Sequence, residues 1–298
     1  MSQSIGFIGL GNMGLGMAAN LVRAGARVQA FDLSSTAVEK ARLAGCAIAT
    51  SASEAATDVD LVITMLPAAA QVSEVWRNAL IPKVRTGALL IDCSTIDVDS
   101  ARQLAREASE VGLFAADAPV SGGVAGAETG SLAFMVGCPE LLFERVKSSL
   151  EPMARVITYA GDAGAGQAAK ICNNMLLGIS MIGVGEAFAL AERLGLEPAR
   201  FFEIASNSSG QCWSLTSYCP WPGLAPSAPS NRGYEGGFLT SLMSKDLKLA
   251  QQAAAKVGAA TPLGAQAQAI YALFETLGYG HKDFSALMQL LRGRAGDL

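Results

Sequence analysis

A lysine and an asparagine stand four residues apart in an apolar stretch of the chain, at Lys170 and Asn174. Residues at positions i and i+4 lie on one face of a helix, so we expect the two polar side chains to point the same way. A cation among apolar neighbours such as Ile171, Leu176 and Leu177 is costly to bury and needs a reason to be there. General-base catalysis is one reason, since burial or a second cation lowers the pKa of a lysine from about 10.4. The alternative is a lysine that reaches the surface at the start of a helix.

Other residues that could carry acid–base or metal chemistry are scarce. The one histidine, His281, lies in Gly278-Tyr279-Gly280-His281-Lys282-Asp283, a composition that favours an exposed turn and a solvated side chain. The sequence has no H-E-x-x-H motif, no clustered cysteines and no carboxylate-rich ligand set, so it indicates no metal site. Lys170 is therefore the leading candidate for a catalytic base.

A glycine-rich segment near the N-terminus predicts a dinucleotide site. A G-x-G-x-x-G motif follows a strand-like run, opens a helical pattern, and consists of Gly9, Leu10, Gly11, Asn12, Met13 and Gly14. The first glycine permits a tight turn, the second lets backbone amides approach a pyrophosphate, and the third lets the helix pack on the strand. The helix N-terminus contributes partial positive charge.

An acidic residue at the expected distance strengthens this prediction. Asp32 follows the second strand-like run, where a carboxylate can accept hydrogen bonds from the ribose hydroxyls of NAD. The 2'-phosphate of NADP would be repelled there, and Leu33, Ser34 and Ser35 provide no arginine to bind it, although Arg42 is nearby. We therefore expect NAD as the cofactor. The alternative role for Asp32 is an N-cap of the following helix.

Short apolar runs alternate with amphipathic stretches from Ser4 to about Tyr159, which is typical of βαβ units. This pattern predicts an α/β fold with an N-terminal Rossmann domain, that is, a doubly wound parallel sheet. Expected helices include Asn12–Ala24, Ser35–Ala44 and Val98–Val111. The expected strands are Ser4–Gly9, Arg27–Phe31, Leu61–Met65, Ala88–Asp92, Leu113–Ala116, Leu132–Val136 and Arg155–Tyr159.

Beyond Gly161 the alternation gives way to long helical patterns, over about 165–194, 197–206, 238–257, 262–277 and 282–292. We therefore expect two domains, an NAD-binding domain over 1–162 and an all-α substrate and oligomerisation domain over 163–298. The stretch between Ser206 and Gly237 is rich in Ser, Pro, Gly and aromatic residues. Loops of that length are usually functional, and the alternative is a surface excursion.

Composition excludes several classes of protein. The net charge of −4 over 298 residues includes no basic block for a nucleic-acid backbone. No export signal precedes the first strand, and the apolar stretch Ile171–Gly185 is shorter than the roughly 18 residues of a membrane span, so it predicts a buried core helix. Most of the six cysteines have apolar neighbours and none forms C-x-x-C, which favours reduced thiols and a cytoplasmic location.

Four motifs along essentially the whole chain resemble the β-hydroxyacid dehydrogenase family. They are the glycine motif, Asp117-Ala118-Pro119-Val120-Ser121-Gly122-Gly123, Gly164-x-Gly166-x-x-x-Lys170-x-x-Asn173-Asn174 and Lys245-Asp246-Leu247. Three further segments are similar to the 3-hydroxyisobutyrate dehydrogenase branch, namely Lys170–Leu177, Ser208-Ser209-Gly210-x-Cys212-Trp213 and Lys282-Asp283-Phe284-Ser285. One departure is Cys219, which stands where close relatives usually have asparagine and could alter substrate preference.

The resemblance implies roles for particular residues. Ser121, Gly122 and Gly123 would bind the substrate carboxylate, a role that suits a hydroxyl and closely approachable amides; a plain glycine turn is the alternative. Asn174 would hold the substrate beside Lys170, although a helical asparagine can also bond locally. Contacts to NAD would come from Leu66, Pro67, Gln71, Thr95 and Lys245. Lys245 would also lower the pKa of Lys170, and the alternative for Lys245 is a surface ion pair with Asp246 or Glu235.

The resemblance also implies the reaction, an NAD-dependent oxidation of (S)-3-hydroxyisobutyrate to methylmalonate semialdehyde as in valine breakdown, with Lys170 as general acid/base. L-serine, 3-hydroxypropionate and tartronate semialdehyde are alternative substrates of relatives. A non-catalytic NAD-binding module is the alternative from another class. Apolar faces in the helical half favour a homodimer or homotetramer, in agreement with the family.

Overall fold

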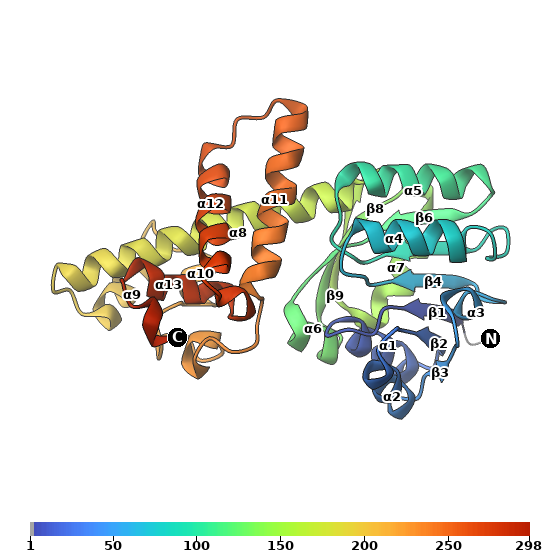
Figure 1. The fold of residues 1–298 in the computed structure, drawn as a ribbon, viewed down its shortest axis with the longest axis horizontal. Helices are drawn as coiled ribbons and strands as arrows, with labels where there is room; N and C mark the ends of the chain where they lie inside the picture. Colours follow the sequence, from blue (N-terminus) through green and yellow to red (C-terminus); the bar gives the residue numbers. More distant parts are fainter. Residues whose placement is uncertain (1–2) are drawn as a thin grey trace. The chain divides into compact units, whose positions relative to one another are not determined.

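The computed structural model describes residues 3–298, and the chain divides into two compact units between Lys170 and Ile171. Helix α8 (Ala165–Arg193) runs through this division (Figure 1). Its first residues belong to the N-terminal unit, because they pack on the sheet there. The boundary expected after residue 162 stays a prediction.

The N-terminal unit contains one nine-stranded sheet in which strand order follows the Rossmann arrangement β3-β2-β1-β4-β5-β6. All the pairings within this part are parallel, so the predicted α/β class is confirmed. The strands are β1 (Ser4–Ile8), β2 (Arg27–Phe31), β3 (Ala47–Ile48), β4 (Leu61–Thr64), β5 (Leu89–Asp92), β6 (Phe114–Asp117), β7 (Val120–Ser121), β8 (Leu132–Gly137) and β9 (Ala154–Gly161).

The sheet departs from the expected all-parallel arrangement at β8, which runs antiparallel to β6 and β7 and parallel to β9. The connection from β6 to β8 contains only β7 and the seven-residue helix α6 (Gly123–Thr129). A helix of that length spans roughly 10 Å, too short to return the chain along the sheet for a parallel crossover. The sequence did not predict β3 and β7, since two-residue strands carry no periodicity.

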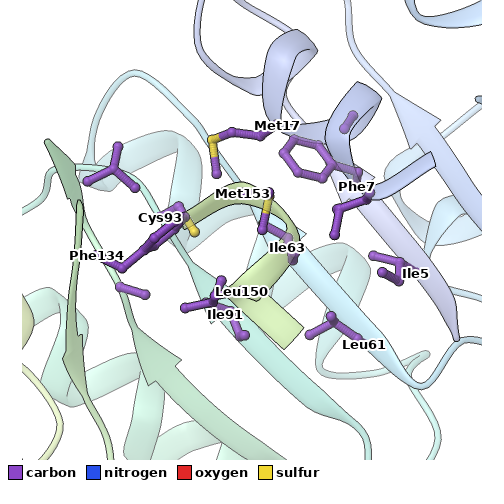
Figure 2. Packing of buried hydrophobic residues seen from close by; sticks show 14 of the residues in the cluster. Ile5, Phe7, Met17, Leu61, Ile63, Ile91, Cys93, Phe134, Leu150 and Met153 are labelled. Atoms are coloured by element: carbon purple, nitrogen blue, oxygen red, sulfur yellow. The ribbon is translucent and has the colours of Figure 1, made fainter. Parts of the chain in front are cut away.

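Both faces of the sheet are covered, and the strand side chains alternate between two apolar clusters. In β4, for example, Leu61 and Ile63 belong to the cluster with Met17 of α1, whereas Val62 belongs to the cluster with Trp76. Figure 2 shows the first cluster, in which Phe7, Ile63 and Ile91 of three neighbouring strands pack with Met17 and Leu150. Burial on both faces explains why the strands read as continuous apolar runs.

Three helices of this unit have an N-terminus that is capped by a side chain. Ser34 accepts a hydrogen bond from Ala37 N, Ser51 from Glu54 N, and Asp97 from Ser100 N. The helices are α1 (Gly14–Arg23), α2 (Ser35–Leu43), α3 (Ala52–Ala55), α4 (Ala69–Val75) with a π-helical turn over Trp76–Leu80, α5 (Val98–Glu110), α6, and α7 (Phe143–Leu150).

The C-terminal unit is helical, as predicted. Its core lies where α8, α11 and α12 bring together Met181, Met243, Leu247, Tyr271 and Phe274. Besides α8, its helices are α9 (Pro198–Ser206), α10 (Trp213–Thr216), α11 (Thr240–Val257), α12 (Pro262–Thr276) and α13 (Leu287–Leu291), with short 3-10 turns at Pro229–Arg232, Tyr279–His281, Phe284–Ala286 and Ala295–Asp297.

The expected loop between Ser206 and Gly237 is more ordered than its composition suggests, because it contains α10 and a 3-10 turn. Buried Asp283 holds its end: one carboxylate oxygen accepts from Tyr218 Oη and Phe238 N, both at 2.8 Å. Cys219 is fully buried in the cluster of Val184, Phe188 and Leu215. Any influence of Cys219 on substrate preference must therefore act through packing.

Helix α8 is 29 residues long and agrees with the helical pattern predicted over about 165–194. The prediction that the apolar stretch is too short for a membrane span is wrong, because by length and composition α8 could cross a bilayer. Core helices of soluble proteins pass the same test, but only 39% of the apolar window of α8 is buried within the chain, so the predicted buried core helix is only partly buried. Glutamate at position 186 does not end the helix, because a single charge on an exposed face is easily tolerated. All six cysteines are free; four are buried, Cys212 is half-buried, and Cys172 is exposed, contrary to expectation.

Candidate active site

The glycine motif forms a tight turn at the carboxyl end of β1. Gly9 has φ +98°, and a Cβ there would lie 2.2 Å from Met65 O. A Cβ on Gly14 would lie 1.9 Å from Gly9 O, so neither position accepts a side chain. A Cβ on Gly11 would meet nothing within 4 Å, which leaves its backbone approachable. Helix α1 starts without a side-chain cap at Met13, an arrangement that suits an anion.

Asp32 stabilises this turn directly. One carboxylate oxygen accepts a hydrogen bond from Leu10 N at 2.6 Å, and the other accepts one from Ser34 N at 2.7 Å. Ser34, not Asp32, caps α2, so the alternative role of Asp32 as an N-cap is wrong. The half-buried carboxylate lies at the end of β2, beside the glycine turn, with lone pairs that remain available for ribose hydroxyls.

A buried polar network connects the carboxyl ends of β4 and β5. Asp92 Oδ1 accepts from Thr64 Oγ1 at 2.7 Å and from Ser94 Oγ at 2.6 Å, and Ser94 Oγ in turn accepts from Leu66 N at 2.8 Å. Trp76 Nε1 donates to Thr64 Oγ1 at 3.1 Å. One predicted cofactor residue, Leu66, is thus held by this network, and a second, Thr95, directly follows its member Ser94 in sequence. Pro67, after β4, and Gln71, on α4, are exposed.

The segment Ser121-Gly122-Gly123 lies where β7 ends and α6 begins. Gly122 has φ +132° and Gly123 has φ +63°, and both positions favour glycine. Gly122 N-caps α6 without a side-chain hydrogen bond. Consecutive amides in such a turn can face a small anion, which is compatible with the predicted carboxylate site and does not exclude a plain turn.

Lys170 and Asn174 occupy successive turns of α8, and both are buried, at 6% and 2% exposed. The alternative of Lys170 extending to the surface is therefore wrong. Asn174 Nδ2 donates to Asp246 Oδ2 at 2.6 Å, and Asn174 Oδ1 accepts from Asn173 at 3.0 Å.

On α11, Lys245 Nζ lies 4.0 Å from Asp246 Oδ1, with its side chain 30% exposed. This ion pair was one of the alternatives for Lys245. Glu235 is the other alternative partner that the sequence suggested for Lys245. Its carboxylate instead pairs with Lys282, at 2.7 Å. Asp246 thus contacts two predicted site residues, Asn174 and Lys245.

Asp117, at the end of β6, caps the helix that carries Lys170. Its Oδ1 accepts from Gly164 N at 2.6 Å, and its Oδ2 accepts from Gln167 N at 2.8 Å. Two glycines allow this close approach: a Cβ on Gly137 would lie 2.5 Å from Asp117 Oδ1, and one on Gly166 would lie 2.3 Å from Met135 O. The G-x-G of the lysine motif therefore serves helix docking on the sheet.

Burial raises the pKa of Asp117 to about 6, opposed by the amide hydrogen bonds from Gly164 and Gln167 and reinforced by the charge of Asp92. Because the folded-state pKa is raised, the folded protein takes up this proton at a higher pH than the unfolded chain does. Stability linked to Asp117 should therefore increase as pH falls through about 6 towards 4, by up to about 3 kcal/mol.

Urea unfolding at pH 7 and at pH 4.5 tests this prediction. The stability of the wild type relative to Asp117→Asn should grow as pH is lowered, because only the wild type can titrate at this position. Asp162→Asn removes an exposed carboxyl and is the matched control. A difference between wild type and Asp117→Asn that does not change over this range would contradict the raised pKa.

Sequence reasoning missed the residues that support the site rather than contact ligands. Asp117 is the first residue of a motif that the sequence analysis used, yet its capping role depends on Gly164, which lies 47 residues later in the chain. Gln167 and Asp246 were also missed; the only signal for Gln167 is a polar side chain one turn before Lys170 on an apolar helix. His281 is exposed, as predicted, and residues 3–298 contain no group of three or more His, Cys, Asp or Glu side chains placed to hold a metal ion.

Comparison with known proteins identifies the family. Residues 4–161 match the model for the NAD binding domain of 6-phosphogluconate dehydrogenase, and residues 164–291 match the NAD-binding model of NADP-dependent 3-hydroxyisobutyrate dehydrogenase. The chain is 49% identical to 3-hydroxyisobutyrate dehydrogenase of Pseudomonas aeruginosa over 97% of its length and 99% of the relative. It is 46% identical to an NAD-dependent L-serine dehydrogenase of the same organism, over 97% of each protein.

A solved structure agrees with these relationships. Mycobacterium tuberculosis 3-hydroxyisobutyrate dehydrogenase with L-serine has a TM-score of 0.94 and 46% identity, with 98% of this chain and 100% of that chain covered. The resemblance seen in the sequence motifs is confirmed over nearly the full length of the chain. The chain therefore belongs to the 3-hydroxyisobutyrate dehydrogenase family of β-hydroxyacid dehydrogenases.

Proposed function

We propose that this protein oxidises (S)-3-hydroxyisobutyrate to methylmalonate semialdehyde with NAD, as in valine breakdown. The observation that carries the proposal is a buried lysine, Lys170, one helical turn before buried Asn174, in a family whose named members are dehydrogenases of β-hydroxy acids. The primary alcohol loses a hydride and a proton, and the products are the aldehyde, NADH and H⁺.

The N-terminal unit fits NAD. The glycine turn leaves backbone amides approachable at Gly11, α1 begins without a side-chain cap, and Asp32 offers a carboxylate beside them. When bound, NAD supplies the hydride acceptor at nicotinamide C4. One family model refers to an NADP-dependent enzyme, but Asp32 favours NAD because its charge opposes a 2'-phosphate. We also propose that NAD is contacted by Leu66, Pro67, Gln71, Thr95 and Lys245.

The residues of the reaction centre have distinct tasks. Neutral Lys170 accepts the hydroxyl proton as the carbonyl forms, and returns it in the reverse direction. Asn174 orients the substrate, and its own amide is fixed by Asp246. Ser121, Gly122 and Gly123 bind the carboxylate through the hydroxyl and backbone amides.

L-serine is the second candidate substrate, because one relative is named an L-serine dehydrogenase and the similar solved structure holds L-serine. Measuring kcat/KM for both acids and 3-hydroxypropionate with NAD, and for the reduction of tartronate semialdehyde with NADH, tests the assignment. We expect (S)-3-hydroxyisobutyrate to be preferred over 3-hydroxypropionate by about 10- to 200-fold, the range that a methyl group in an apolar pocket provides. It should also be preferred over L-serine, which carries an ammonium group in place of the methyl. A higher kcat/KM for L-serine would transfer the assignment to that substrate. Tight NAD binding without NADH formation from any of the acids would instead favour a non-catalytic module.

The protein is proposed to be a homodimer or homotetramer. Only 39% of the apolar window of α8 is buried within one chain, and Leu176, Leu190 and Ile204 are each more than half exposed. Apolar area of this extent is typical of an interface between copies. Free cysteines are compatible with the proposed cytoplasmic location.

A further inference from the structure

Gln167 joins α8 to the strand-end segment that contains Thr95. Its side chain is 0% exposed, Nε2 donates to Ser94 O at 2.8 Å, and Oε1 accepts from Ile96 N at 3.1 Å. The amide therefore pairs with the backbone on both sides of Thr95, in the manner of a neighbouring β-strand. A side chain needs one donor and one acceptor at fixed spacing to do this, and glutamine provides both.

The same residue is fixed at its backbone. Gln167 N donates to Asp117 Oδ2 at 2.8 Å, so the side chain and the main chain of one residue dock the helix on the ends of β5 and β6. Through Ser94 Oγ, the network continues to Leu66 N at 2.8 Å. One residue proposed to contact NAD, Leu66, is thus linked to α8 through Ser94, and the two backbone neighbours of a second, Thr95, bond directly to Gln167.

Helical geometry connects Gln167 with the proposed base. Positions 167, 170 and 174 follow the i, i+3, i+7 spacing of one helical face, so Lys170 lies one turn beyond the amide that faces the Thr95 segment. Any rotation or slide of α8 in this region moves Lys170 relative to Thr95. A misplacement of about 1 Å between reacting groups can cost about 100-fold in rate.

We propose that Gln167 is a positioning residue of the dehydrogenase reaction, which sets the location of Lys170 relative to the segment at Thr95 that is proposed to contact NAD. It does not contact the reacting atoms. This inference rests on the proposed function, since it assigns Lys170 as the base.

Two substitutions at Gln167 test the two hydrogen bonds of its side-chain amide. Gln167→Met keeps the volume and removes both hydrogen bonds, and we expect kcat to fall about 10- to 100-fold. Gln167→Glu retains an acceptor for Ile96 N, and once protonated it also regains a donor for Ser94 O. Gln289→Met is the matched control, because Gln289 is another buried amide, bonded to Tyr234 Oη at 2.8 Å in the C-terminal unit; its kcat should stay within twofold of wild type.

The pH dependence of kcat in Gln167→Glu distinguishes a positioning role from a general loss of structure. Dividing its kcat by that of the wild type at each pH removes the pH effects that the two proteins share. The introduced carboxyl faces Asp92 through Ser94 and Asp117 through the helix start, and has Lys170 one turn away. We expect the ratio to be highest at low pH, where the carboxyl is protonated, and to fall at least tenfold as pH rises.

A flat ratio over the pH range, or kcat within twofold of wild type for both Gln167 variants, would overturn the inference. If Gln167→Met does not fold, as judged by circular dichroism, the ratio for Gln167→Glu decides alone. If wild type forms no NADH from any β-hydroxy acid, the proposed function fails. In that case the dissociation constant for NAD tests the link to Thr95, with Gln167→Met expected to bind at least fivefold more weakly than Gln289→Met, and equal binding would contradict it.

Discussion

Replacement of Lys170 by alanine should lower kcat for β-hydroxy acid oxidation by about 100- to 10,000-fold, the usual contribution of a general base. The amine is buried and lies on the same helical face as Asn174, which is proposed to orient the substrate. KM for the acid should change far less than kcat, because the lost interaction is with the transferred proton rather than with the carboxylate. NADH absorbance at 340 nm in steady state measures both constants.

Two further variants make this result specific. Lys83→Ala removes an exposed lysine from the same unit and should leave kcat unchanged. Lys170→Arg keeps the positive charge but cannot lose its proton near neutral pH, so it should be as inactive as the alanine variant. Activity of Lys170→Arg close to wild type would show that the charge, and not proton transfer, is what the site requires.

Replacement of Asp32 by alanine should lower kcat/KM for NAD by about 10- to 150-fold, equivalent to the roughly 1.5–3 kcal/mol of hydrogen bonds to a charged group. The loss has two origins: the ribose hydroxyls lose their acceptor, and Leu10 N in the glycine turn loses a 2.6 Å partner. The preference for NAD over NADP should narrow at least tenfold, because the carboxylate no longer repels a 2'-phosphate.

Steady-state kinetics with each cofactor, together with thermal unfolding, measure these effects of Asp32. Glu110→Ala, which removes an exposed carboxylate at the end of α5, is the control and should retain both constants. An unchanged cofactor preference in a folded Asp32→Ala protein would show that selectivity lies elsewhere, for example at Arg42.

Most of the N-terminal fold could be predicted from the sequence because both faces of its sheet are buried. Strands such as Leu61–Thr64 and Leu89–Asp92 are buried throughout and apolar up to their last residue, and glycines and caps separate them from helices. The antiparallel β8 could not be predicted, since pairing direction depends on the short α6 rather than on the strand itself. The length of α8 could be predicted, because the helical periodicity over about 165–194 continues past Glu186, which is exposed in the structure.

The residues of the candidate site could be predicted where their spacing along the sequence indicates their role. Gly9, Asp32 and the pair Lys170 and Asn174 carry such signals, and the structure places each of them beside polar or backbone partners or on one buried helical face. Gln167 carries no such signal, because its partners Ser94 and Ile96 are more than 70 residues away in sequence. Such long-range pairing of a side chain with backbone depends on the tertiary structure.

The most direct test of the central claim is the rate of hydride transfer in a single turnover, measured by stopped-flow NADH absorbance with saturating NAD and (S)-3-hydroxyisobutyrate. A single turnover reports chemistry rather than product release. If Lys170 is the base, the wild type should show a fast NADH phase, and Lys170→Ala should show that phase slowed by about 100-fold or more. An NADH phase in Lys170→Ala at the wild-type rate would contradict the assignment.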